Sequence, residues 1–290
     1  MSAYAYFPGC KIPYHLPQYG QATRAVCASL GLELTDLAFN CCGYPARHLS
    51  LEASVLAAAR NFALAHAAGL PILTPCKCCF GNMRHAAHWL RENARLRQGT
   101  EALLKREGLR LPPAREMRIV HLLTALDQDL GAGAIAARVT RPATGLKVAA
   151  HYGCHALRPG AVTQFDNPLS PTIFERLLEA VGATPVDWPL RLECCGNPLW
   201  GKNDAMAAAL AVRKLRDAAR AGADVVCTAC TYCHLQFHTL RPHLDLAQMG
   251  PDAPPALLFA QLLGLALGLG GAEVGLEEHV PQRLALMAVV

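Results

Sequence analysis

Cys41-Cys42-Gly43 and Cys194-Cys195-Gly196 are two copies of one tripeptide, at matching positions in the two halves of a 290-residue chain. Each copy has a Gly-Cys upstream and a Cys-x-x-Cys downstream. The offset between the halves is 144 residues for the Gly-Cys, 153 for the adjacent pair and 154 for the last two cysteines. One insertion between Cys154 and Cys194 explains nearly all of this difference. We therefore interpret the chain as an internal duplication.

Each half is expected to follow the series strand, helix, strand, helix, strand. Strands are predicted over 3–7, 34–40 and 71–74, and again over 147–151, 185–193 and 224–228. Helices are predicted over 18–30, 50–68, 171–181 and 204–221, with glycine stops at Gly31, Gly69, Gly182 and Gly222. This order predicts an α/β fold of two pseudo-symmetric, Rossmann-like halves, each a small parallel sheet flanked by helices.

The cysteines of both halves fall just after predicted strands. Ligands of parallel sheets gather outside the carboxyl ends of the strands, so loops at that edge are expected to hold a bound group.

Charged helical stretches between about 98 and 144, with a break at Pro112-Pro113, separate a first domain (1–120, with a linker to about 144) from a second (145–290). The second includes a C-terminal helix with a less regular segment after it. The apolar stretch 256–271 contains Gln261 and four glycines, and we predict a buried helix there rather than a membrane span.

Composition narrows the class of protein. The chain has thirteen cysteines and no apparent signal peptide, which favours a reducing, cytoplasmic setting in which cysteine clusters bind metal. The net charge of +5 is mild, and no basic run indicates nucleic acid.

Thiolates suit zinc or iron-sulfur clusters. Structural zinc takes four ligands, usually as two separated pairs, whereas each half here offers five cysteines, two of them adjacent. A multi-iron cluster has ligand positions several ångströms apart, so neighbouring cysteines can bind different irons. An iron-sulfur protein is the favoured interpretation; a zinc site and plain buried cysteines are the alternatives.

The duplicated Gly-Cys, Cys-Cys-Gly and Cys-x-x-Cys pattern resembles the CCG domains of the B subunit of heterodisulfide reductase. The similarity covers essentially the whole chain and includes residues 261–268. The resemblance implies two noncubane 4Fe-4S clusters, each held by five cysteines, with disulfide chemistry between them. Carried over by position, the implied ligands are Cys10, Cys41, Cys42, Cys76 and Cys79 in the first half and Cys154, Cys194, Cys195, Cys230 and Cys233 in the second.

Three cysteines remain outside these sets. Cys227 and Cys230 also form a Cys-x-x-Cys, but aligning 74–76 with 228–230 matches Cys227 to Leu73, a strand residue. We therefore interpret Cys227 as a core thiol, and Cys27, on a helix, in the same way. Cys78 is either a bystander or a reactive thiol beside the first cluster.

Basic residues lie beside the motifs. Reduction of a disulfide releases two thiolates that need protons, and histidine can supply them near neutral pH. His155, directly after Cys154, is the candidate catalytic proton donor; its alternative role is local hydrogen bonding or neutralisation of thiolates. For Lys11, Lys77 and His151 neutralisation is the favoured role, and Arg47 and His48 have no stronger claim.

The resemblance implies an oxidoreductase acting on sulfur groups: the catalytic component of a heterodisulfide reductase-like complex. Apart from these motifs, the chain has neither a ferredoxin-type cysteine run nor a Gly-x-Gly-x-x-Gly fingerprint after a strand, so we expect it to receive electrons from other proteins. The resemblance implies that these partners are the ferredoxin-like C subunit and the flavoprotein A subunit of such a complex. Alanine and arginine richness suggests a GC-rich bacterium, where relatives act in sulfur oxidation with a lipoate-binding protein as carrier. The alternative function is electron relay toward quinone for a succinate, glycolate, lactate or glycerol-3-phosphate dehydrogenase. A non-redox zinc scaffold is a third.

Overall fold

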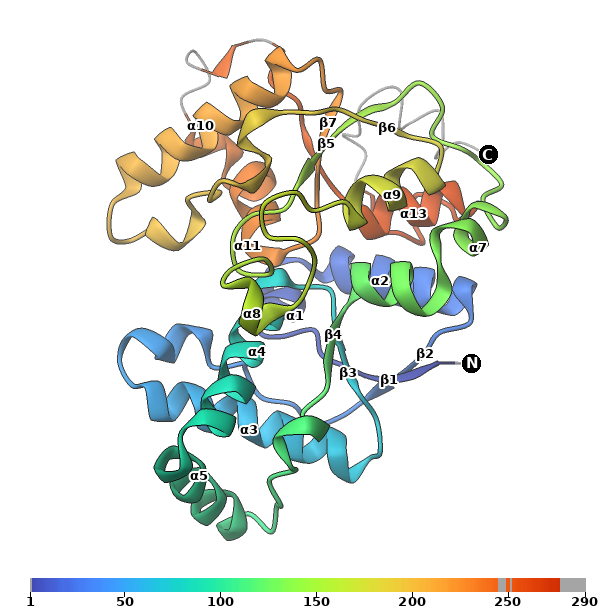
Figure 1. Ribbon diagram of the computed structural model, residues 1–290. Coiled ribbons are helices and arrows are strands. Elements are labelled where there is room, and N and C mark those ends of the chain that lie inside the picture. Colours follow the sequence, from blue (N-terminus) through green and yellow to red (C-terminus); the bar gives the residue numbers. More distant parts are fainter. Residues whose placement is uncertain (1, 245–248, 251, 277–290) are drawn as a thin grey trace.

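The computed structural model describes residues 2–244, 249–250 and 252–276 and contains one four-stranded sheet in each half (Figure 1). All strand pairs are parallel. The strand order is β2-β1-β3-β4 in the first sheet and β6-β5-β7-β8 in the second, so the two halves share one topology. The strands are β1 (Ala3–Tyr6), β2 (Glu33–Asp36), β3 (Ile72–Thr74), β4 (Ile119–His121), β5 (Lys147–His151), β6 (Thr184–Pro185), β7 (Val225–Thr228) and β8 (Ala256–Leu258). The predicted α/β class and duplication are confirmed.

Helices cover the sheets and carry the chain from strand to strand. They are α1 (Lys11–His15), α2 (Pro17–Leu30), α3 (Leu51–Ala67), α4 (Lys77–Glu92), α5 (Ala94–Arg106), α6 (Leu122–Thr124), α7 (Ala132–Ala136), α8 (Gly160–Thr163), α9 (Ile173–Ala180), α10 (Asp204–Arg220), α11 (Thr231–His234) and α13 (Phe259–Ala266). Capping explains the equivalent starts of α3 and α10, where the side chains of Ser50 and Asn203 accept backbone hydrogen bonds from Ala53 and Met206. All four predicted glycine stops have positive φ.

The structure differs from the sequence-based expectation at the sheet edges. The fourth strand of each sheet, β4 and β8, was not predicted, because each has three residues and shows no readable alternation. The strand expected over 185–193 is limited to β6, since Pro185 has no N–H to continue the ladder and Pro189–Leu192 form a 3₁₀ turn. The first sheet therefore extends to His121, into the segment expected to be a linker.

The C-terminal helix α13 connects the two halves. It follows β8 directly and packs on α2 of the first half, where Cγ2 of Val26 lies 3.4 Å from the position of a Cβ on Gly264 (Figure 1). All eight residues of α13 are buried, which confirms the predicted buried helix over 259–266, whereas 256–258, expected to belong to it, form β8. Within the described residues, helices with the length and apolar character of a membrane span are not found. The irregular segment expected after α13 continues into 277–290, outside the described residues.

Gly43 offers a test of how tightly the loop after the first adjacent cysteines packs on α3. Its φ is +89°, and a Cβ there would collide with the carbonyl oxygen of Ser54 on α3. Gly43→Ala should therefore lower the free energy of unfolding by about 3 kcal/mol, from overpacking and a strained φ together. Gly31→Ala is the matched control, because Gly31 also has positive φ but no atom within 4 Å, and it should cost about 1 kcal/mol. Chemical denaturation measures both values; equal losses would contradict the packing argument.

Candidate metal centre

The strand order creates a crevice at the carboxyl edge of each sheet. The chain leaves β1 toward β2 on one side and later returns through β3 on the other side, so the loops after β1 and β3 diverge. Cys10 follows β1 and Cys76 follows β3; in the second half Cys154 and Cys230 occupy the same positions after β5 and β7. The helices α1, α4, α8 and α11, near these loops, gather where the two halves meet (Figure 1).

Ten cysteine sulfurs form one continuous run of neighbours. In the first half Cys41 interacts with Cys10, their Sγ atoms being 3.7 Å apart, and with Cys42. The second half repeats this order, and the run passes between the halves through Cys76 and Cys230. In full, the order of interacting thiols is Cys10, Cys41, Cys42, Cys79, Cys76, Cys230, Cys233, Cys195, Cys194, Cys154. The structure therefore brings together all ten cysteines that the sequence singled out.

Local backbone features bring these sulfurs close to the main chain. A Cβ on Gly9 would lie 2.8 Å from Sγ of Cys79, and one on Gly153 would lie 3.5 Å from Sγ of Cys233. The side-chain amide of Asn82 on α4 donates to the carbonyl oxygen of Cys42 at 2.8 Å. Both glycines have positive φ, which favours glycine, and at Gly9 the sulfur of Cys79 also leaves no room for a Cβ.

The thiols shift one another's pKa values. Cys10 lowers the pKa of Cys41, and Cys154 lowers that of Cys194, both well below the ordinary range. Cys233 and then Cys76 lower the pKa of Cys230, whereas burial raises that of Cys76 to about 11. Some of the ten thiols are thus stabilised as thiolates, the form that binds metal.

Two of the three remaining cysteines, Cys227 and Cys27, lie apart from the run. Cys227 is buried on β7 and pairs with Ala150, as Leu73 pairs with Tyr6, so the strand register matches Cys227 with Leu73. Burial raises the pKa of its thiol. Cys27, on α2, is buried as well, and burial raises its pKa to about 12.

Cys78 lies near cysteines of both halves, whereas the sequence indicated only a place beside the first cluster. Its thiol is buried and interacts electrostatically with Cys76, Cys230, Cys42 and Cys154. Burial raises its pKa well above the ordinary value, which keeps it a thiol.

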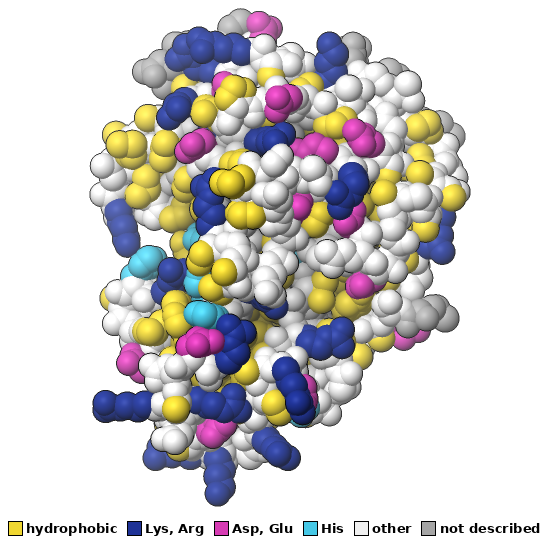
Figure 2. Space-filling view, viewed as in Figure 1, with side chains coloured by type: hydrophobic (Ala, Val, Ile, Leu, Met, Phe, Trp, Pro, Cys, Tyr) yellow, Lys and Arg dark blue, Asp and Glu magenta, His cyan; other side chains and the backbone are white. Residues whose placement is uncertain are grey.

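His155 lies at the contact between the halves. Its ring is 4.9 Å from that of Tyr44, centroid to centroid, and its backbone packs against Gly81 of α4 so closely that a Cβ there would collide with it. Tyr232, from the second half, lies 5.7 Å from Tyr44. Burial, followed by the charge of Arg47, lowers the pKa of His155. On the face seen in Figure 2, histidine side chains gather at the level where the halves meet.

The other basic residues that were predicted near the motifs lie against aromatic rings. Lys11 is half-buried, with Nζ 5.7 Å from the ring centroid of Tyr232. Arg47 lies over the ring of Trp89, and the ring of His48 is 6.0 Å from that of Tyr44.

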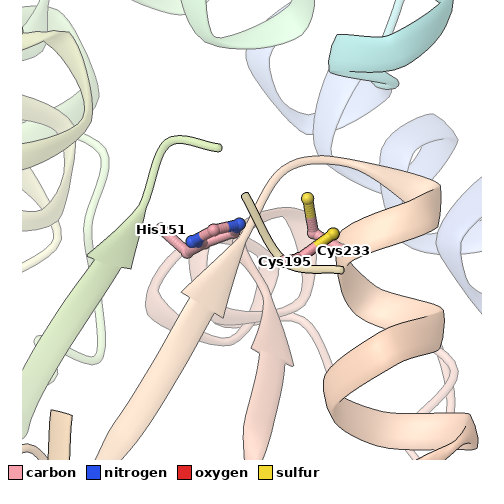
Figure 3. A group of neighbouring side chains, drawn as sticks. All are labelled: His151, Cys195 and Cys233. Carbon is pink, nitrogen blue, oxygen red and sulfur yellow. The ribbon is translucent and has the colours of Figure 1, made fainter. Parts of the chain in front are cut away.

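Three basic side chains are buried beneath the second set of cysteines. Lys77, 2% exposed, extends from α4 into the second half and donates to the carbonyl oxygen of His151 at 3.1 Å. The ring of His151 faces Cys195 and Cys233, and one ring nitrogen and the two sulfurs lie within 4.8 Å of one another (Figure 3). Lys214, also 2% exposed, donates to the carbonyl oxygens of Leu190 and Glu193. Burial lowers the pKa of both lysines to about 8.

Sequence reasoning missed Lys214 and His121. Nε2 of His121 lies 3.1 Å from the carbonyl oxygens of both Pro75 and Ala229, which precede Cys76 and Cys230. Its imidazole thus lies between the two third-strand loops. His121 belongs to the unpredicted strand β4, so no signal marked it. Lys214 was recognisable as a charge on the apolar face of α10.

Two parallel α/β halves with converging cysteines at facing edges define a duplicated cysteine-rich protein whose thiol sets suit iron-sulfur clusters. The family model "Cysteine-rich domain" (CCG) matches residues 4–84 and 148–238. The chain is 33% identical to the B subunit of the ferredoxin/F420H2-dependent CoB-CoM heterodisulfide reductase of Methanosarcina acetivorans, covering 100% of this chain and 97% of that one. The chain belongs to the heterodisulfide reductase B subunit family of duplicated CCG proteins.

Other relatives have different names. The 8-methylmenaquinol:fumarate reductase membrane anchor subunit of Wolinella succinogenes is 30% identical, with 96% of each chain covered. A crystal structure of a hypothetical protein from Helicobacter pylori superposes with a TM-score of 0.75 at 18% identity, over 96% of this chain and 51% of that one. The chain thus spans about half of the Helicobacter protein, and that likeness concerns the fold alone.

Proposed function

We propose that the chain is the catalytic B subunit of a heterodisulfide reductase-like complex, with one noncubane 4Fe-4S cluster in each half. The ligands of the first are Cys10, Cys41, Cys42, Cys76 and Cys79, and those of the second are Cys154, Cys194, Cys195, Cys230 and Cys233. When bound, such clusters transfer single electrons. The observation that supports the proposal is the contact between Cys76 and Cys230, because clusters held by the two sets of cysteines would then be neighbours. A disulfide needs two electrons for its reduction, and adjacent sites can supply one each.

The residues around this contact have roles in the proposed reaction. Tyr44, Tyr232 and His155 meet between the two sites, and they suit a substrate sulfur with an apolar chain. The imidazole of His155 supplies a proton to the thiolate released when the disulfide is reduced. In the opposite direction, from thiol to disulfide, it accepts that proton.

The proposed partners are the ferredoxin-like C subunit and the flavoprotein A subunit of the complex, which exchange electrons with the chain. If the complex works in bacterial sulfur oxidation, a lipoate-binding protein is the proposed carrier of the substrate.

A second function is favoured by one relative. The Wolinella protein is named as part of a quinol:fumarate reductase, so a chain of this family also occurs in electron transfer with a quinol. In this function both clusters relay electrons and no sulfur substrate binds. Small disulfides added to the loaded protein distinguish the two functions: a change in the paramagnetic signal of the clusters supports the first, and an unchanged signal supports relay.

The cluster content gives a direct test. Protein purified without oxygen after iron-replete expression should contain about eight irons and eight acid-labile sulfides per chain, since two four-iron clusters are proposed. Metal and sulfide analysis of the same sample measures both. Stoichiometric zinc without sulfide would overturn the proposal and favour the zinc scaffold.

A further inference from the structure

The two sites are equivalent in their cysteines but differ in the residues behind them. Position 7, at the end of β1, is Phe, and its equivalent at the end of β5 is His151. The equivalence is spatial as well: a Cβ on Gly9 would meet Cys79 and Phe7, whereas one on Gly153 would meet Cys233 and His151. Among the described residues, neither ring nitrogen of His151 has a hydrogen-bond partner. A buried donor beside Cys195 and Cys233 is therefore available to a group held by these sulfurs.

The second difference lies in the helices after the adjacent cysteines. Lys214 of α10 occupies the position of Asn61 in α3. Asn61 donates to the carbonyl oxygens of Asn40 and Cys41 at 3.1 and 3.3 Å, and Lys214 donates to the carbonyl oxygen of Glu193, the equivalent of Asn40, at 3.1 Å. The hydrogen bonds are similar, but the second half has an ammonium group where the first has a neutral amide.

The third difference comes from residues that cross between the halves. Thr231 follows Cys230, and its hydroxyl lies 3.0 Å from Sγ of Cys76 in the first half. Lys77 follows Cys76 and extends into the second half, where Cys233 and Cys230 are its main charged neighbours. At the cysteines, the first half thus receives the hydroxyl of Thr231 and the second half receives the ammonium group of Lys77.

The buried cations distinguish the second site, and other ions lie near both sites. Lys11 lies beside Cys10 in the first half, but it is half-buried and partly screened by water. Glu175, which accepts a hydrogen bond from Tyr152 at 2.5 Å, is a charged neighbour of Lys77, and Glu193 is a charged neighbour of Lys214. In the described part of the chain, the buried lysines are Lys77 and Lys214, and both lie at the second site.

We propose that these buried groups make the second site the electron-accepting one, so that electrons pass from the first half to the second. Cationic side chains and N–H donors stabilise the reduced, more negative form of a cluster and raise its reduction potential. One electron leaves the first cluster, which is oxidised, and arrives at the second, which is reduced. No bond or proton is exchanged in this step, and the reductant is the partner's electron carrier. The proposal rests on the two clusters of the proposed function and adds the direction of transfer between them.

The two midpoint potentials test the proposal directly. Cys41→Ala should leave only the second cluster and Cys194→Ala only the first, so a redox titration followed by electron paramagnetic resonance assigns each potential. The second cluster should have the higher potential by at least about 59 mV, a tenfold preference for the electron. Equal potentials, or a higher one for the first cluster, overturn the proposal. Absence of iron from both variants and from the unmodified chain would instead refute the proposed clusters.

Charge removal then identifies the cause. Lys77→Met and Lys214→Met each keep an aliphatic stem. Each should lower the midpoint potential of the second cluster by about 59 mV, which is a tenfold loss of preference for the electron, and should leave the potential of the first cluster unchanged. His151→Phe installs the residue of the first half and should also lower it. Lys105→Met, at an exposed position of α5, is the control for net charge and should shift neither potential. Equal shifts of both potentials in the buried-lysine variants contradict the assignment. Lys77 and Lys214 lie on different helices, so loss of the cluster in one variant leaves the other informative.

Discussion

Replacement of Cys230 by alanine should reduce the bound iron from about eight to about four atoms per chain, whereas replacement of Cys227 should leave it near eight. The two residues are three positions apart, and both form a Cys-x-x-Cys spacing. Cys230 lies in the run of interacting sulfurs, between Cys76 and Cys233. Cys227 lies on β7 in the register position of Leu73.

The pair of variants is matched because both cysteines are buried and lose the same atom. Iron and sulfide analysis of anaerobically purified protein gives the result, and a denaturation curve checks that both variants fold. If Cys227→Ala lost the iron and Cys230→Ala kept it, the alignment of the two halves would be shifted by three residues.

Replacement of His155 by glutamine should keep both clusters and lower disulfide or thiol turnover by roughly a hundredfold, the lower end of what a positioned acid contributes. Glutamine retains a hydrogen-bonding group but cannot supply the proton. His243→Gln, at an exposed position, is the control and should keep full turnover. The assay uses the assembled complex, since the proposed electron source is a partner. Unchanged turnover in His155→Gln would make this residue a local hydrogen-bonding group.

The pH dependence gives a second measurement of the same role. Burial and then the charge of Arg47 lower the pKa of His155, so its protonated form is scarce at neutral pH and increases as the pH falls. Disulfide reduction should therefore become faster from about pH 7.5 to about pH 6, and His155→Gln should lose this dependence. An identical slope in both proteins would assign the titration to another group.

The sequence predicted the arrangement of the ten cysteines well because each lies near the end of a clear strand, or in a loop fixed by a following glycine. The α/β class followed from the repeated order of strands and helices, and the helix ends followed from Gly31, Gly69, Gly182 and Gly222, where positive φ leaves little choice of residue. These are local signals, and duplication doubled each of them. The resemblance to the heterodisulfide reductase B subunit, stated on the same residues, is confirmed.

Features that depend on contacts between the halves were not predictable in the same way. β4 and β8 are too short to show alternation, and His121 was missed with β4. Lys77 and His151 were expected to neutralise the clusters, but the placement of Lys77 at the second site depends on how α4 packs against the second half. Alignment of the two halves matches Phe7 with His151 and Asn61 with Lys214. The burial of Lys77, His151 and Lys214 at the second set of cysteines is a tertiary property that the alignment does not show.

The packing of α13 on α2 sets an order of events during synthesis. The apolar face of α2 is translated early, but its partner at 259–266 emerges more than 200 residues later. At typical translation rates this interval is on the order of tens of seconds. During that time the first half has its cysteines but lacks the helix that covers α2 and the loop that supplies Cys230. The nascent chain therefore exposes the apolar face of α2, a surface of the kind that chaperones bind. A fragment that contains the first half and ends in the segment between the halves should aggregate when it is expressed alone.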